Sequence, residues 1–296
     1  MCIILFFNSF RGNGQNDTSI NYKTRKVILL LGTAAFTGGS LVYLNEAWYK
    51  QYSNGSFHFF DDNAEWLQMD KFGHAYTTFQ TSRLMINSFK WAGFNKKQQM
   101  YIGGTLGLAY MTVIEVMDGF SSGWGFSWGD ELANVLGTAA SLGQYAAWNE
   151  HRFNIKYSYW PTNYAQYNPN LLGKSYSEQF LKDYNGQTYW LSVSPFSFIK
   201  SDKYLPKWLA ISFGYGADGM LGARDNNSIV AIDENGNVKT FNRSRQYYIS
   251  LDIDLSKIKT KSKILKAVFN AFNLLKVPSP TIEFINGKTV FHYIYF

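Results

Sequence analysis

The chain has 296 residues, of which 46% are hydrophobic and 18% aromatic, so it is long enough for one large core or two domains. Its formal net charge is +7, but the sequence contains no recognisable nucleic-acid-binding module. The basic balance therefore indicates at most an affinity for anionic surfaces. A single cysteine, Cys2, excludes an intrachain disulfide. The aromatic content is typical both of membrane interfaces and of a large buried core.

Residues 1–26 are predicted to be a degenerate signal or linker. Residues 1–10 are apolar but lack a basic start, and residues 11–21 are polar and rich in Gly and Asn. Residues 27–44 are uncharged, follow three basic residues, and lie at the lower length limit for a membrane span. Because glycines dilute their hydropathy, both a membrane span and a buried or membrane-apposed helix remain open.

Residues 27–150 are predicted to form a bundle of about four helices with short joins, over residues 27–44, 70–94, 96–118 and 128–148. The third helix contains Gly103, Gly104 and Gly107, which permit close approach of a neighbouring helix.

Residues 151–296 are predicted to be an aromatic-rich α+β region. Residues 157–169 show an irregular pattern, and residues 175–182 indicate a short helix. Antiparallel strands are predicted over residues 186–194, 208–215, 245–255, 281–285 and 288–296. Asn286 and Gly287 form a strong hairpin turn signal between the last two strands. Residues 261–276 have the pattern of an amphipathic helix. The predicted fold class is therefore α+β.

Polar residues interrupt the apolar helical runs at three places, where acids and a histidine recur at helical spacing. We expect these side chains to converge between helices as one polar cluster. Its candidate members are Asp70, Lys71, His74, Glu115, Asp118, Ser127, Asp130 and Asn134.

Three interpretations of this cluster remain open. Asp70, Ser127 and Asp130 precede or open helical runs, so helix capping accounts for them without any chemistry. The second interpretation is a hydrogen-bonded polar network without an ion. The third interpretation is a site for a hard or borderline divalent metal, the only candidate cofactor, with ligands His74, Glu115, Asp118 and Asp130. Glu115 near a helix end opposes the macrodipole, so we expect it to need compensation.

The same residues carry a resemblance to a known family. Asp70-Lys71-x-x-His74, Glu115-x-x-Asp118-Gly119 and Ser127-x-x-Asp130-x-x-x-Asn134 resemble the motifs of the YfiM-like family of predicted periplasmic lipoproteins. Residues 57–60 and 182–192 are similar to the longer form found in Bacteroidota. VanZ-like membrane proteins show a more distant similarity. The resemblance implies a cell-envelope protein, periplasmic or outer-membrane-associated, built on a domain of unknown function, and it supplies no reaction.

Two functions follow as alternatives. The first is a structural or accessory interaction protein, with a helical domain at the membrane and a β-containing domain that docks on a membrane or outer-membrane protein partner. The second is a metal-dependent hydrolase that acts on an envelope lipid or glycan, with a carboxylate as the general base. We expect no nucleic-acid partner.

Overall fold

A computed structural model of the chain describes residues 21–50, 55–199, 206–227, 229–232 and 236–296. The predicted leader at residues 1–10, and the linker up to residue 20, lie outside the described residues. The chain forms two compact units. The helical unit comprises Met1–Phe60, Thr77–His151 and Ile258–Phe272, and the sheet unit comprises Asp61–Tyr76, Arg152–Lys257 and Asn273–Phe296.

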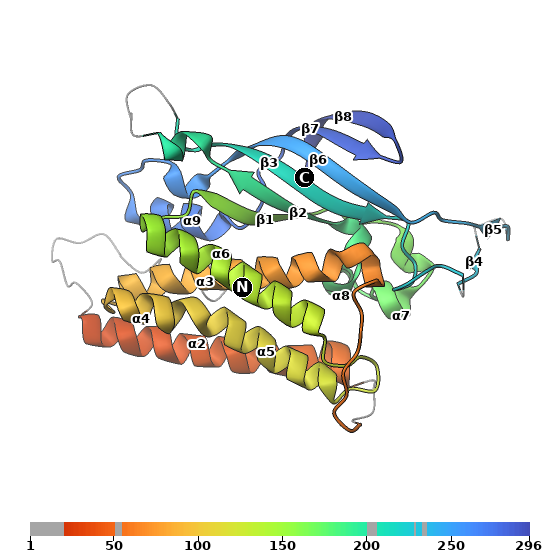
Figure 1. Cartoon of the computed structure of the whole chain (residues 1–296), viewed down its shortest axis with the longest axis horizontal. Helices are drawn as coiled ribbons and strands as arrows, with labels where there is room; N and C mark the ends of the chain where they lie inside the picture. Colours follow the sequence, from red (N-terminus) through yellow and green to blue (C-terminus); the bar gives the residue numbers. More distant parts are fainter. Residues whose placement is uncertain (1–20, 51–54, 200–205, 228, 233–235) are drawn as a thin grey trace. The chain divides into compact units, whose positions relative to one another are not determined.

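The helical unit confirms the expected bundle. Its helices are α2 (Tyr22–Leu44), α3 (Met69–Trp91), α4 (Lys96–Tyr101), α5 (Leu106–Gly119), α6 (Trp128–Trp148) and α9 (Lys263–Phe272) (Figure 1). The first turns of α3, up to Tyr76, belong to the sheet unit. A π-helical turn, Asn45–Tyr49, extends α2. The predicted helix over residues 96–118 is interrupted by a 3-10 turn, Gly103–Thr105, because two consecutive glycines have little helix propensity.

Glycines allow the helices of this unit to pack closely. A Cβ atom at Gly104 would lie 2.4 Å from Leu142 Cδ2, and one at Gly107 would lie 2.8 Å from Thr81 Cβ. The close approach expected for the third helix is therefore present. The Tyr145 hydroxyl also donates to Gln99 Oε1 at 2.6 Å, which ties α6 to α4.

Two helical stretches are long and apolar enough to cross a membrane, namely Tyr22–Leu44 and Lys96–Gly119. No residue of α2 is buried, and the Tyr110 hydroxyl of α5 donates to Ser40 Oγ at 3.0 Å. Core helices and signal sequences meet the same criterion of length and composition. A membrane span over residues 27–44 therefore stays a prediction.

The sheet unit confirms the predicted α+β fold. Six described strands form one antiparallel sheet in the order β1 (Phe153–Tyr159), β2 (Gln187–Val193), β3 (Leu209–Asp218), β6 (Ser244–Ile253), β7 (Ser279–Ile285) and β8 (Lys288–Tyr295) (Figure 1). A second sheet pairs β4 (Ala231–Ile232) with β5 (Val238–Lys239). The short helices are α7 (Pro169–Leu172) and α8 (Tyr176–Lys182). Further 3-10 turns are Glu65–Gln68, Tyr164–Gln166, Tyr184–Gly186, Pro195–Phe198 and Leu255–Lys257.

The structure corrects two boundaries. The sequence pattern did not predict β1, and the amphipathic helix ends at Phe272 rather than at residue 276. Both differences have one cause, because the chain after α9 pairs with the free edge of β1. The Tyr157 N–H donates to Leu274 O at 3.0 Å, and the Lys276 N–H donates to Tyr157 O at 2.9 Å. Backbone hydrogen bonds between distant segments thus replace the last helical turn.

The hairpin between β7 and β8 has the predicted turn. Asn286 has a φ of 50° and Gly287 a φ of 73°. Positive φ at both central residues is the requirement of a type I′ turn, whose twist matches that of the flanking strands.

The sheet has an inverted distribution of polarity. Its apolar row runs across all six strands as Ile155, Leu191, Phe213, Ile249, Ile282 and Phe291. The last five of these side chains are 39 to 56% exposed. The neighbouring polar row, on the opposite face, runs as Asn154, Ser192, Ser212, Ser250, Thr281 and His292. The first five members of the polar row are buried.

Part of the apolar face is covered within the sheet unit. The Phe72 ring of α3 stacks on Tyr215 with 4.6 Å between ring centroids, and Tyr76 lies 5.8 Å from Tyr189. Met69, which is fully buried, packs with Tyr76, Tyr189 and Tyr215 in the core of the unit over β1, β2 and β3. The rest of the apolar row extends beyond this cover.

Candidate functional site

The eight predicted site residues belong to both units. Glu115, Asp118, Ser127, Asp130 and Asn134 lie in the helical unit, where α5 ends and α6 begins. The other three residues, Asp70, Lys71 and His74, lie in the sheet unit on the first turns of α3. Each group has its own set of contacts, and convergence of all eight residues stays a prediction.

In the helical unit, Glu115 and Ser127 join the end of α5 to the start of α6. The Ser127 Oγ accepts the Asp130 N–H at 3.1 Å, which confirms Ser127 as the N-cap of α6. The Ser127 N–H donates to Glu115 Oε2 at 3.2 Å. Glu115 is 1% exposed and Asp130 3% exposed. The N-terminus of α6 is therefore capped by Ser127 together with the carboxylate of Glu115 from α5.

Glu131, which the sequence analysis did not single out, links the same two helices. The Thr112 hydroxyl of α5 donates to Glu131 Oε1 at 2.8 Å, and Asn134 Nδ2 donates to Glu131 Oε2 at 3.3 Å. Asn134 is fully buried. Its position one turn into α6 places an amide beside the cap, as the i, i+4 spacing from Asp130 predicts.

Asp118 contacts an aromatic side chain from the turn after α2. The Tyr49 hydroxyl donates to Asp118 Oδ1 at 2.7 Å, and the Tyr49 ring lies 6.0 Å from the Trp124 ring. Burial, followed by the charge of Asp118, raises the pKa of Tyr49 above its usual value. Tyr49 therefore remains a hydrogen-bond donor to this acid at any physiological pH.

In the sheet unit, Asp70 lies in the first turn of α3, which begins at Met69. The Tyr184 hydroxyl donates to Asp70 Oδ1 at 2.5 Å. His74 Nε2 lies 3.8 Å from the same oxygen, one helical turn further along. Asp70 is thus engaged by a side chain more than one hundred residues away, rather than acting before the helix as an N-cap.

Lys71 forms the closest ion pair of this group, with Lys71 Nζ 2.6 Å from Asp62 Oδ1 and 3.8 Å from Asp70 Oδ2. Sequence analysis missed Asp62 and Tyr184. Asp62 precedes the helix in an irregular loop without periodicity, and Tyr184 is distant in sequence, so neither had a local signal.

The backbone before α3 is in a rarely populated conformation. Trp66, Leu67 and Gln68 have φ values of 47°, 50° and 67°. Each non-glycine residue at positive φ costs free energy, and such residues concentrate at functional sites. Contacts within the unit hold the turn, since the Trp66 N–H donates to Ala223 O at 2.7 Å and Arg245 Nη2 donates to Gln68 Oε1 at 2.7 Å.

Tyr189 of β2 packs directly on α3. A Cβ atom at Gly73 would lie 2.9 Å from the Tyr189 hydroxyl oxygen, so the approach requires a glycine there. That hydroxyl donates to Gln187 Oε1 at 2.7 Å. Burial, followed by the charge of Asp70, raises the pKa of Tyr189 well above its usual value.

Either group of carboxylates can hold a hard cation by its chemistry. A carboxylate has about four lone-pair directions, so it can accept a hydrogen bond and also coordinate a metal ion. The group in the helical unit offers oxygen ligands, and the group in the sheet unit adds the imidazole nitrogen of His74, both of which suit a hard or borderline divalent ion. The metal interpretation of His74, Glu115, Asp118 and Asp130 therefore stays a prediction.

A second polar cluster, which sequence analysis missed, lies on the polar face of the sheet. Lys156 Nζ lies 2.9 Å from Asp252 Oδ2, and both side chains are 0% exposed. The hydroxyls of Ser192 and Ser212 donate to the same Asp252 oxygen at 2.6 and 3.2 Å. Lys276 Nζ donates to Leu251 O at 2.7 Å, and burial lowers its pKa to about 8. The pair is well satisfied by hydrogen bonds, which is what a buried ion pair requires.

Comparison with known proteins adds one family. Residues 58–146 match the family model described as "Predicted periplasmic lipoprotein (DUF2279)". The matched segment contains all eight predicted site residues. No curated protein and no solved structure matches the chain.

Proposed function

We propose that this chain, whose residues 58–146 match the model of the predicted periplasmic lipoprotein family, is a cell-envelope protein with an accessory, non-enzymatic role at the outer membrane. In this role the sheet unit docks on an outer-membrane protein. The observation that supports the proposal is the exposed apolar row, whose members Leu191, Phe213, Ile249, Ile282 and Phe291 lie on five consecutive strands.

Exposure of this row to water is unfavourable. Burial of apolar surface contributes roughly 25 cal/mol per Å². A contiguous apolar patch on a soluble protein therefore marks an interaction surface more often than scattered exposed residues do. The cross-strand register makes the row contiguous, because Phe213 pairs directly with Leu191 and with Ile249.

Buried hydrogen bonds on the polar face explain why the polar and apolar faces of the sheet do not exchange places. A shift of one residue in register would turn every side chain to the other face. Such a shift would break the buried Lys156–Asp252 pair and its serine donors. The inverted polarity is thus fixed by buried hydrogen bonds, and the apolar row needs a partner of its own.

The experiment is site-specific photo-crosslinking of the full chain in cells. A photoreactive amino acid at Phe213 or Phe291 should give an adduct with an outer-membrane protein. The control is the same group at Tyr176, a highly exposed aromatic residue on α8. Adduct formation at Tyr176 equal to that at Phe213 and Phe291 would contradict docking through the apolar row.

A second candidate function is a metal-dependent hydrolase that acts on an envelope lipid or glycan. It is favoured by the carboxylates of Glu115 and Asp130, which are both buried where α5 ends and α6 begins and which offer the oxygen ligands that a hard divalent ion prefers. Elemental analysis of the purified protein tests it. Stoichiometric metal that is lost in Asp130→Asn would support the hydrolase, and absence of metal from active, freshly isolated protein would contradict it.

A further inference from the structure

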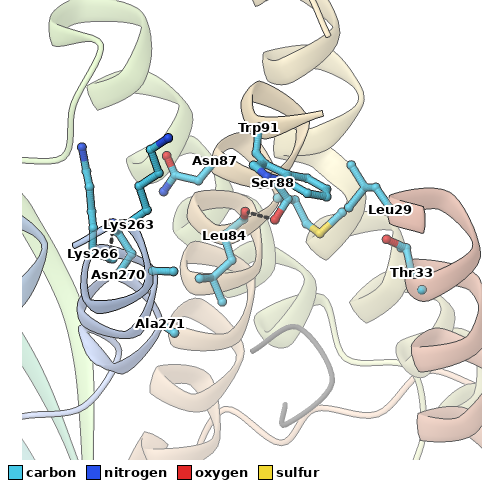
Figure 2. Close-up of a pocket in the computed structure, with 13 residues that line it drawn as sticks. Leu29, Thr33, Leu84, Asn87, Ser88, Trp91, Lys263, Lys266, Asn270 and Ala271 are labelled. Atoms are coloured by element: carbon cyan, nitrogen blue, oxygen red, sulfur yellow. Dashed lines mark hydrogen bonds between the residues drawn. The ribbon is translucent and has the colours of Figure 1, made fainter. Parts of the chain in front are cut away.

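The helical unit contains a cavity of about 250 Å³ between α2, α3 and α9 (Figure 2). Leu29 of α2 and Leu84 of α3 contribute apolar walls, and Ala267 of α9 lies beside them. Lys263 and Lys266 of α9 also line the cavity, and both side chains are exposed. The cavity thus combines apolar walls with two cations at its α9 side.

Two polar side chains in the wall, Ser88 and Asn270, form hydrogen bonds within their own helices. Ser88 Oγ donates to Leu84 O at 2.8 Å, as the dashed line in Figure 2 shows, and Asn270 Nδ2 donates to Lys266 O at 2.9 Å. A hydroxyl or amide that is bonded within its helix presents mainly carbon to the cavity. The walls therefore suit a hydrocarbon chain better than a polar small molecule.

Helix α9 has a second, exposed apolar side. Ile264, Leu265, Val268 and Phe272 are all exposed, at helical spacing. Four exposed lysines accompany them within eight residues: Lys259, Lys261, Lys263 and Lys266. The first of these, Lys259, is exposed in the segment that precedes the helix. A helix with an apolar side and flanking lysines is the pattern of segments that lie in the interface of an anionic bilayer.

At the start of α2, beside the cavity, two basic side chains pack against aromatic rings. Arg25 Nη1 donates to Trp91 O at 3.3 Å, and its guanidinium lies 5.5 Å from the centre of the Trp91 ring. Lys26 Nζ lies 4.8 Å from the Phe94 ring centre. Trp91 itself lines the cavity. Tryptophan and basic side chains concentrate at the headgroup level of membranes.

We infer that this cavity binds an anionic glycerophospholipid, with its phosphate at Lys263 and Lys266 and an acyl chain against Leu29 and Leu84. The charges of the two lysines complement the phosphate, and the internally bonded walls complement the chain. Continuity with helix α2, none of whose residues is buried, lets the acyl chain enter from a bilayer rather than from water. This binding goes beyond the proposed docking of the sheet, since it involves the helical unit alone.

The test measures binding of the purified full-length protein to a fluorescent phosphatidylglycerol analogue, with zwitterionic phosphatidylcholine, which has no net charge, as the comparison. The Lys263→Glu/Lys266→Glu variant should bind the anionic analogue at least about 25-fold more weakly, since each lysine near an anionic surface contributes about five-fold. The matched control is Lys174→Glu/Lys288→Glu, which makes the same charge change at two exposed lysines of the sheet unit. The control should bind like the natural protein.

A second variant tests the cavity itself. Ala267→Trp fills the space between α9 and the other walls, and it should lose binding of the acyl chain while the lysines remain. The melting temperature of Ala267→Trp is measured to verify that this variant folds. If it does not fold, the lysine variants decide the test, because their substitutions lie at exposed positions and leave the core intact. Equal binding by the lysine variant and its control, or tight binding by folded Ala267→Trp, would overturn the inference.

A competition experiment distinguishes an anionic phospholipid from a free fatty acid, since both combine an acyl chain with a negative charge. Displacement of the analogue by phosphatidylglycerol but not by oleate supports a phospholipid site. Displacement by oleate at equal concentration would overturn it in favour of a fatty-acid site. Because the proposed lipid site lies in the helical unit alone, failure here leaves the crosslinking result for the sheet unaffected.

Discussion

The backbone N–H of Ser127 donates to the carboxylate of Glu115 over 3.2 Å, so the acid near the end of α5 also caps the start of α6. A negative charge near the C-terminus of its own helix is unfavourable, but the same charge at the N-terminus of the next helix is favourable. The α6 terminus thus provides compensation for Glu115 within the helical unit.

Substitution of Glu115 should separate charge from hydrogen bonding. Glu115→Ala removes a charged acceptor from a buried donor and should lower the free energy of unfolding by about 1.5–3 kcal/mol. Glu115→Gln retains an acceptor oxygen, so it should lose only the charge contribution, about 0.3–2 kcal/mol. Urea denaturation of the two variants measures the difference. Equal losses would show that Ser127 does not depend on this oxygen.

The Lys156–Asp252 pair should behave as one unit. Lys156→Met removes the ammonium nearest to a buried carboxylate, and Asp252→Leu leaves a buried ammonium without its carboxylate, so each should cost about 3–5 kcal/mol of stability. The double variant should lose clearly less than the sum of the two. A double-mutant cycle in denaturant gives the coupling, and strict additivity would refute a direct interaction between the side chains.

Lys276 should make stability depend on pH in the alkaline range. Its pKa in the folded protein is about 8, below the ordinary value of 10.5. Between these values the unfolded chain binds more protons than the folded chain, so the contribution of this group to stability rises with pH. The stability of the natural protein relative to Lys276→Met should therefore increase from pH 8 toward pH 10. Chemical denaturation at several pH values measures this, and a flat difference would contradict the lowered pKa.

Alanine substitution at two glycines of the helical unit should change the stability of the protein in opposite directions. A Cβ atom at Gly107 would lie 2.8 Å from Thr81 Cβ and 3.3 Å from Thr78 O, whereas nothing lies within 4 Å of one at Gly143. Gly107→Ala should destabilise by about 1–3 kcal/mol through overpacking. Gly143→Ala, in the exposed interior of α6, should stabilise by about 0.5–1 kcal/mol. Thermal melts compare the two, and a stabilising Gly107→Ala would refute the close contact.

Local sequence patterns determined much of this protein. The helical periodicity predicted the bundle, the Ser127 cap predicted the start of α6, and the pair Asn286 and Gly287 predicted its turn, because each depends on residues close together in the chain.

Only the tertiary structure decided which row is buried. A period of two defines two faces but assigns neither to the interior, so the burial of Ser212 and the exposure of Phe213 follow from how the whole sheet folds. The partners of the candidate site were hidden for a related reason. Tyr184 reaches Asp70, and Leu274 pairs with Tyr157, across more than one hundred residues, and such contacts leave no local periodicity in the sequence.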